Sequence, residues 1–344
     1  MSEKQQAALA ELDKDLKKNY ENIKDKLRSL YNDLQIKLSV IPEGDNSIHF
    51  YYADLKGKLT EIPAEDSNKL GGNTEEAKKH NLLAKNIPNN ANRIITRGKI
   101  NADSIPYGLS VYAGDDIVLD ASEADILASG KNISINEMND HSNKLEHSLY
   151  AKGNVSAGFV GNNPSMGNNA VLAGGDISVL ESDVSLFAGS NVDAHRLSGM
   201  VNAVGDIKAD FVSPKHDDIF PPKLMAGGSI VVKDAYANMA SGKDIIFTGD
   251  NVKLIGGYRA KNSISAAGID HSYYNDTEVQ DYYDGIPIVT PKLHSTDTEK
   301  PESFVGEHVH VNDWKKHIED MNKPSSRTGN LSQAKKEAAS QERK

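Results

Sequence analysis

The stretch VLAGGDISVLESDVSLFAGSNVDAHRLSGMVNAVGDIKAD, residues 171–210, contains one short phrase three times. Gly175–Ile177, Gly189–Val192 and Gly205–Ile207 each place glycine and a polar residue before a β-branched residue. An alternating run of apolar and polar residues follows each phrase, which is typical of a β-strand. The phrase therefore predicts strands that begin at equivalent points of a repeated coil.

The same phrase recurs through residues 93–268. Its β-branched residues give ten anchors at Ile100, Ile117, Ile133, Val155, Ile177, Val192, Ile207, Ile230, Ile245 and Ile264. The steps between them are 17, 16, 22, 22, 15, 15, 23, 15 and 19 residues, a base step near 15 with additions. Such an internal repeat is of solenoid type. We therefore predict an all-β fold, a single-stranded, right-handed parallel β-helix or β-solenoid of about ten coils.

Residue choice within the repeat favours this fold over an antiparallel β-sandwich. Sandwich strands are also short and joined by glycine turns, but they do not usually share one residue pattern at a fixed register. Small residues such as Ala113, Ala188 and Ala203 suit a narrow interior. We expect the glycines of the phrase to supply the positive φ angles of tight corners, and the adjacent Asn or Asp to cap those corners.

The long steps add residues at one place in the coil. Residues 136–148, 161–169 and 213–222 each follow the first strand of a coil and precede the second. A solenoid would present these three loops along one edge, where insertions commonly bind partners. Simple tolerance of insertion at one corner is the alternative. The candidate binding residues in the loops are His141, His147, Met166, His216 and Asp217.

The flanks of the repeat have their own patterns. Residues 1–40 predict an amphipathic α-helix that either covers or caps the solenoid or forms a coiled coil. Its apolar residues at heptad spacing are Leu16, Tyr20, Ile23, Leu27, Leu30 and Leu34. Residues 41–92 predict a short β-hairpin at 47–62 and a linker. Residues 269–305 predict an acidic, tyrosine-rich cap and linker, and residues 306–344 a short helix and a polar, disordered tail.

Composition and charge exclude several functions. The net charge of −10 disfavours nucleic acid as a partner, because phosphate binding draws on clustered Lys and Arg. The absence of cysteine removes disulfides, thiolate nucleophiles and cysteine-based metal centres. We expect no membrane span, no signal peptide and synthesis in the cytoplasm, with signal-peptide-independent export left open. No glycine string opens a helix as a phosphate-binding loop must, so no cofactor is expected.

Three strings carry a resemblance to known repeat families. They are Ala173–Ile177, Ala188–Val192 and Ala226–Ile230. These strings resemble the repeats of filamentous-haemagglutinin-type exoproteins and, more distantly, those of the polymer-forming bactofilins. The resemblance covers residues 93–268 and implies a β-helix, with adhesion or filament formation as the functions it suggests. The chain departs from the haemagglutinin group because neither a signal peptide nor a secretion domain is visible in it. It departs from the bactofilins, which usually have short disordered termini, in its long N-terminal helix and its three insertions.

Acidic residues near the predicted corners define an enzymatic alternative. Polysaccharide lyases and hydrolases with β-helical folds use carboxylates about 5–10 Å apart. The candidate catalytic residues are Asp183, Asp193, Asp210, Asp217 and Asp218, with Arg196 and His216 nearby. However, Asp is expected at corners in any case, and the chain offers few aromatic residues to line a sugar groove. His308 and His310 would begin a metal site only with further ligands.

These patterns together predict a non-enzymatic β-solenoid scaffold or interaction protein of bacterial type. It would bind a protein or surface partner through the loops on one edge, with self-assembly into a homo-oligomer left open. A carbohydrate-active lyase or hydrolase is one alternative. An effector or adhesin-like protein exported without a cleaved signal peptide is the other.

Overall fold

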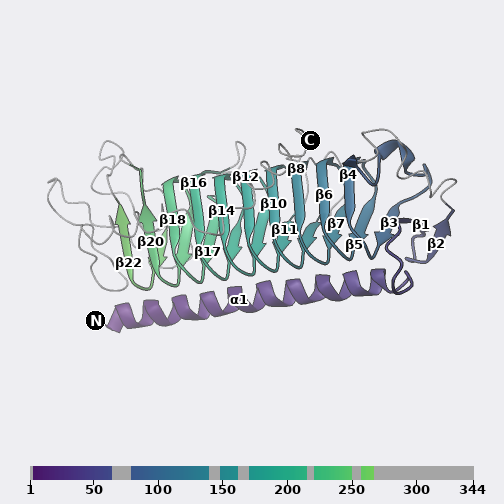
Figure 1. Ribbon diagram of the computed structural model, residues 1–344. Coiled ribbons are helices and arrows are strands. Elements are labelled where there is room, and N and C mark those ends of the chain that lie inside the picture. The colour runs from purple at the N-terminus through teal and green to yellow at the C-terminus, as the bar shows by residue number, and fades with distance from the viewer. Residues whose placement is uncertain are drawn as a thin grey trace. The chain divides into compact units, whose positions relative to one another are not determined.

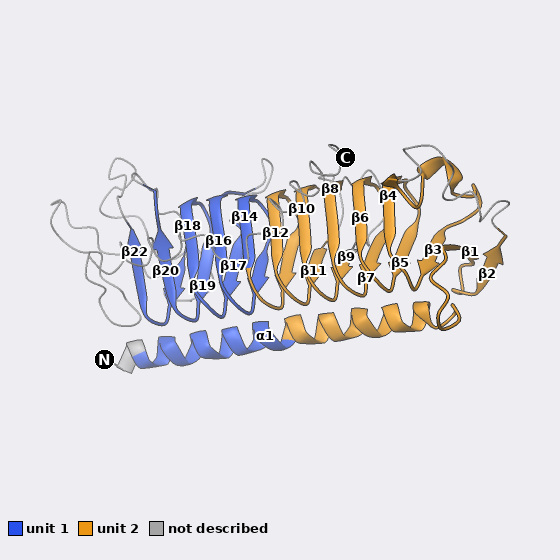
Figure 2. Ribbon diagram, in the orientation of Figure 1, with its two compact units in different colours: residues 1–21, 192–344 blue, residues 22–191 orange. Residues whose placement is uncertain are grey.

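The computed structural model describes residues 3–63, 79–138, 148–161, 170–214, 221–249 and 257–266. This part of the chain is mostly β, with one long helix, α1 (Glu3–Leu38), and strands β1 to β22 (Figure 1). The chain divides into two compact units (Figure 2). Unit 1 contains residues 1–21 and 192–344, and unit 2 contains residues 22–191. The predicted segments 269–305 and 306–344 lie outside the described residues.

Unit 2 contains strands of two sheets, here called sheet A and sheet B. Its sheet A has the spatial order β2 (Leu59–Ile62), β1 (His49–Ala53), β3 (Arg93–Thr96), β5 (Ser110–Ala113), β7 (Ile126–Ser129), β9 (Ser148–Ala151), β11 (Ala170–Ala173) and β13 (Ser185–Ala188). Its sheet B has the order β4 (Ile100–Ile105), β6 (Ile117–Ser122), β8 (Ile133–Met138), β10 (Val155–Val160) and β12 (Ile177–Ser182). From β3 onward neighbouring strands are parallel and successive strands alternate between the sheets, as in a β-helix or solenoid.

Unit 1 repeats this alternation. Its sheet A has the order β15 (Val201–Ala203), β17 (Lys223–Ala226), β19 (Asn238–Ser241) and β21 (Tyr258–Ala260). Its sheet B has the order β14 (Val192–Leu197), β16 (Ile207–Val212), β18 (Ile230–Ala235), β20 (Asp244–Phe247) and β22 (Ser263–Ala266). These strands are parallel to their neighbours within the unit.

The ten predicted anchors stand in register. Within each unit neighbouring anchors are direct partners, as Ile100 is with Ile117 and Ile207 is with Ile230. The other pairs follow the same rule. All ten anchor side chains are buried, so they form apolar columns inside the solenoid. The repeated phrase therefore places a β-branched residue at the same point of each coil, where it stacks on the one in the next coil.

The polar residue before each anchor belongs to a hydrogen-bonded ladder. The Asp176 N–H donates to the Asn154 side-chain oxygen at 2.8 Å, and the Asn154 N–H donates to that of Asn132 at 2.9 Å. Asp176 Oδ1 in turn accepts bonds from the backbone and side-chain nitrogens of Asn191, at 3.0 and 2.9 Å. Each side chain thus satisfies a corner amide of a neighbouring coil, which explains why Asn and Asp recur there.

Close backbone approach, and not positive φ, explains the corner glycines. A Cβ added to Gly189 would lie 2.3 Å from the carbonyl oxygen of Gly174 in the neighbouring coil. Among the described glycines, only Gly44, Gly57 and Gly108 have positive φ, and none of them belongs to the repeated phrase. The expectation that the phrase glycines supply positive φ is therefore wrong. Glycine fits at such a position because the backbone of the neighbouring corner occupies the place that a Cβ would take.

Helix α1 has a buried stripe with an 11-residue step. Leu12, Ile23 and Leu34 are completely buried and lie 11 positions apart. This spacing gives about 3.67 residues per turn, close to a straight α-helix, whereas a heptad gives 3.5. Tyr20, which the heptad assignment places in the apolar stripe, is 44% exposed. The described stripe thus differs from that of a left-handed coiled coil.

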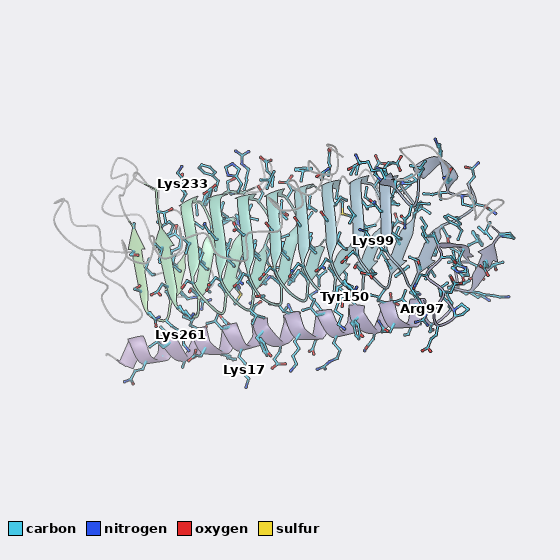
Figure 3. The ribbon with its side chains drawn as sticks, viewed as in Figure 1. Lys17, Arg97, Lys99, Tyr150, Lys233 and Lys261 are labelled. Carbon is cyan, nitrogen blue, oxygen red and sulfur yellow. The ribbon has the colours of Figure 1, made fainter. Side chains whose placement is uncertain are left out.

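In unit 2 the outer face of sheet A lies beneath residues 22–38 of α1. Lys26 Nζ lies 5.0 Å from the ring centre of Phe187, and Lys152 Nζ lies 4.7 Å from that of Tyr31. The outward residues of this face are nevertheless buried, and they include Tyr112, Tyr150, Leu172 and Phe187. Burial raises the pKa of Tyr112 to about 12, and that of Tyr150 likewise to about 12. Tyr150 is labelled in Figure 3.

The first parallel strand of each sheet in unit 2 is covered by an earlier segment. Strand β1 pairs antiparallel with both β2 and β3, so this hairpin covers the edge of β3. On sheet B, Leu82 forms a bridge with Ala102 of β4, just before the short 3-10 helix Ala84–Asn86. The Ala84 N–H donates to the Asp103 carboxylate at 2.9 Å. These contacts remove strand edges that would otherwise recruit other chains.

Candidate functional site

The two corners of the coil differ in length. Three residues separate the last residue of each sheet A strand from the following anchor, as residues 174–176 do before Ile177. The return from sheet B to sheet A varies from two residues, 183–184, to ten residues, 213–222. The predicted insertions 161–169 and 213–222 coincide with this variable corner. The insertion predicted over 136–148 is shorter, because residues 136–138 belong to β8 and Ser148 begins β9, which leaves 139–147 as the connection. Residues 248–257 form a further long connection there, which the sequence repeat alone did not single out.

Most of the candidate residues in these loops lie outside the described residues. They are His141, His147, Met166, His216, Asp217 and Asp218. His308 and His310 of the C-terminal region are also outside. The described candidates are Asp183, Asp193 and Asp210. Asp183 lies in the short corner after β12 in unit 2, and its N–H donates to the Val160 carbonyl oxygen at 3.0 Å.

Sheet B presents three residues per strand on its outer face. In β16 the residues Ile207, Ala209 and Val212 are buried, and Lys208, Asp210 and Phe211 lie between them. The fourth residue of each such strand has no register partner, which marks a local bend. The second, fourth and fifth positions of each strand therefore form the outer surface.

In unit 1 these outward positions carry a cluster of charged residues on three adjacent strands, here called the sheet-B cluster. Its polar and charged members are Asp193, His195, Arg196, Lys208, Asp210, Lys233 and Asp234, and the aromatic Phe211 lies among them. The remaining outward position holds Val231, which is buried. Asp193 is the register partner of Lys208, and Phe211 is the register partner of both Arg196 and Asp234. Asp193 and Lys208 thus place opposite charges side by side on neighbouring strands, whereas Phe211 stands between Arg196 and Asp234.

The centre of the sheet-B cluster is a hydrogen-bonded pair beside an aromatic ring. His195 Nδ1 and Asp210 Oδ2 are hydrogen-bonded at 2.8 Å, and about half of each side chain is exposed. The His195 ring meets the Phe211 ring edge-on, with centres 5.5 Å apart. Lys233 Nζ, labelled in Figure 3, lies 5.7 Å from the Phe211 ring centre. Phe211 therefore holds both a cation and an imidazole in place.

Asp193 has an electrostatic environment unlike that of an ordinary surface carboxylate. Burial raises the pKa of Asp193, the nearby Lys208 ammonium lowers it, and the Asp210 carboxylate raises it further. The structure thus brings Asp193 and Asp210 onto adjacent strands of one surface, together with Arg196 and His195. A group of this kind can hydrogen-bond and ion-pair with a polar ligand or a protein surface.

The same outward positions in unit 2 are chemically different. The sheet-B strands β4, β6, β8, β10 and β12 carry no Lys, Arg or His there. Their outward residues are Asn101, Asp103, Ser104, Val118, Asp120, Ala121, Ser134, Asn136, Glu137, Ser156, Gly158, Phe159, Ser178, Leu180 and Glu181. Cationic side chains on this face are thus a property of β14 to β18. Counting one, three and four residues beyond each anchor would have revealed His195, Phe211 and Lys233 from sequence.

Comparison of the chain with protein-family models, with curated protein sequences and with solved structures finds no match. The resemblance to filamentous-haemagglutinin-type and bactofilin repeats therefore stays a prediction. Within the described residues, no helix combines the length and apolarity needed to cross a lipid bilayer. Over the same residues no group of three or more His, Asp or Glu side chains is placed to hold a metal ion.

Proposed function

We propose that the protein is a non-enzymatic β-solenoid scaffold of about ten right-handed coils that binds a protein partner. Binding takes place along the variable corner, where the inserted segments leave sheet B. The observation that carries this proposal is the contrast between the two corners, one constant at three residues and the other between two and ten residues long.

Stacking alone gives no reason for the difference between the corners. Both must pass the chain from one sheet to the other, and two residues at 183–184 suffice for the return. Longer connections at the same corner are not required to link the two sheets, which supports a role in recognition. The sheet-B cluster adjoins this edge, since residues 213–222 directly follow β16.

Site-specific cross-linking tests the proposal, because the chain has no cysteine of its own. Single cysteines carrying a photoactivatable cross-linker are placed within residues 162–169 or 213–222 of the full chain. The matched control is Ser190→Cys, in the constant corner. We expect both loop positions to cross-link the same protein in cells and the control to cross-link none of it. Replacing either loop by the two-residue corner 183–184 should weaken binding of that protein in a purified system.

Equal cross-linking from the loops and from Ser190 would contradict the proposal. So would unchanged affinity of the loop-shortened variants, provided that circular dichroism shows them folded. Self-assembly is a further outcome of the same experiment, since cross-links to a second copy of the chain would identify the partner as the protein itself.

A carbohydrate-active enzyme is the second candidate function. Asp193, with its raised pKa, and Asp210, paired with His195, supply a general acid and a carboxylate on adjacent strands. A panel of polysaccharides assayed for new reducing ends or unsaturated products tests this candidate. Activity that disappears in both Asp193→Asn and Asp210→Asn, but persists in Asp234→Asn, would favour it. Inactivity of the unaltered chain across the panel would argue against it.

A further inference from the structure

In unit 1 the outer face of sheet A is in polar contact with residues 3–21 of α1. Asp15 Oδ2 lies 2.9 Å from Arg259 Nη2 of β21. Asp13 forms a second ion pair with Lys261, which directly follows β21 and is labelled in Figure 3. Lys17, also labelled there, is exposed. Two ion pairs thus hold the first half of the helix to this sheet.

The surface beneath these residues is polar and built from few large apolar groups. Its outward column consists of Asn202, Met225, Ala240 and Arg259, joined by strand register. All four are buried. Asn19 of the helix is buried as well. Arg259 Nη1 is buried without a hydrogen-bond partner among the described residues, a cost that hydration would relieve.

The corresponding surface in unit 2 has the opposite character. Its outward column includes Tyr112, Tyr150, Leu172 and Phe187, all buried. The helix half that lies on it contributes the fully buried Ile23 and Leu34. Uncovering this column would expose large apolar side chains to water, which is strongly unfavourable. Uncovering the column in unit 1 would mainly hydrate polar and small groups.

We propose that residues 3–21 form a releasable strap, and that the sheet face beneath it is a docking site for an acidic amphipathic helix of a partner protein. The strap is the half of α1 whose departure costs least. The face it leaves presents two cations, Arg259 and Lys261, beside the adaptable thioether of Met225. The docking site lies on sheet A and does not depend on the loops of the proposed function.

Charge complementarity selects the chemistry of the partner. The strap itself supplies one fully buried leucine, Leu12, with carboxylates at Asp13 and Asp15. A partner helix with the same arrangement would satisfy Arg259 and Lys261 in the same way. A basic or uncharged helix would leave the buried Arg259 without its carboxylate, which is unfavourable, and would leave the part-exposed Lys261 unpaired.

A peptide competition on the full chain tests the docking site. The probe is a fluorescent peptide with the sequence of residues 1–21, and its matched control carries Asn in place of Asp13 and Asp15. Fluorescence anisotropy measures binding to the unaltered chain and to the strap-weakened variant Asp13→Asn/Asp15→Asn. We expect the variant to bind the probe about tenfold more tightly than the unaltered chain, because its own strap competes less. The control peptide should bind neither chain.

Covalent locking of the strap supplies the decisive control. With no native cysteine present, Asp13→Cys/Lys261→Cys can be joined by a cleavable bis-maleimide linker. The reference is the unlinked double-cysteine chain, which lacks Lys261 and should still bind the probe through Arg259, more weakly than the unaltered chain does. We expect linking to abolish this binding and cleavage of the linker to restore it. The matched control locks the other helix half through Tyr31→Cys/Lys152→Cys, residues that also contact each other, and should leave probe binding unchanged.

Hydrogen exchange of the unaltered chain gives a second readout that needs no variant. Raising the salt concentration should accelerate amide exchange in residues 3–21 about tenfold and leave residues 22–38 nearly unchanged. Equal response of the two halves, or probe binding that survives the 13–261 lock, would overturn the proposal. A dimer of the strap-weakened variant in sedimentation would overturn the assignment to a partner protein and give the face to a second copy.

Discussion

Asp176 shows at the scale of one residue how the repeated phrase becomes structure. Its backbone N–H is satisfied by Asn154 and its carboxylate satisfies two nitrogens of Asn191. The sequence predicted that Asn and Asp would cap these corners, but not that each would serve a different coil. That bond depends on stacking, which is absent from any single stretch of sequence.

Replacing Asp176 tests the ladder. We expect Asp176→Ala to destabilise the chain by about 1–3 kcal/mol, because the part-buried amide nitrogens of Asn191 lose their acceptor. Urea unfolding followed by circular dichroism measures the change. Ser178→Ala, two residues further on the outer face, is the control and should change stability by less than about 0.5 kcal/mol. Equal effects of the two substitutions would contradict a role for the ladder.

Asp193 carries a cost in stability that depends on pH. Burial raises its pKa in the folded chain above the ordinary value of 3.8, so folding favours its protonated form. The charged carboxylate therefore destabilises the fold at neutral pH, and this penalty fades as pH falls through the folded pKa. We expect Asp193→Asn to raise the unfolding free energy at pH 7 and to have little effect at pH 3. A lower unfolding free energy of Asp193→Asn at pH 7 would contradict this, because it would show that the Asp193 carboxylate stabilises the fold.

At the scale of the element, α1 shows where the sequence pattern misled. Leu16, Tyr20 and Ile23 suggest a heptad, yet the completely buried residues Leu12, Ile23 and Leu34 follow an 11-residue step. Asn19 also lies on the buried face, and a search for apolar periodicity does not find it because it is polar. Only the sheet beneath the helix reveals which of its faces is buried.

The covering of sheet A by α1 in unit 2 can be measured through the ionisation of two tyrosines of that sheet. Tyr112 and Tyr150 have folded pKa values of about 12, above the ordinary 10.0. Their contribution to stability is complete below pH 10 and is lost as pH rises towards 12, because the unfolded chain ionises first. Tyrosinate absorbance should show these residues titrating late. In Leu34→Ala, which removes a buried contact of the helix, the late titration should move towards ordinary values.

At the scale of the whole molecule, the register of the anchors was readable from sequence and the faces were not. Within each unit the five anchors lie in the predicted register, because each is tied to a phrase of fixed length. The contact between His195 and Asp210 joins residues 15 positions apart, and it becomes visible only when two coils are laid side by side. The cluster could therefore be predicted only after the register was known.

Solubility of the molecule should depend on the hairpin that covers β3. Phe50 is buried and is the register partner of Ile62 and Ile94, whereas Tyr52 on the same strand is 49% exposed. We expect Phe50→Ala to weaken the hairpin by about 3–5 kcal/mol and to uncover the edge of β3. Light scattering should then show concentration-dependent association. Tyr52→Ala should stay as little associated as the unaltered chain. Equal association of the two variants would contradict the proposal that the hairpin covers the edge of β3.

Because one corner of the coil always has three residues and the other varies in length, insertions at the two corners should have different effects. Residues added between sheet B and the next sheet A strand only lengthen a connection at the surface. A single residue added between a sheet A strand and its anchor, for example after Gly174, would shift the alternation of the following strand. Ile177 and Val179 would then face water, and Ser178 would enter the apolar column. We therefore expect insertions in the gene to be tolerated between sheet B and sheet A, and to disrupt the fold between sheet A and the following anchor.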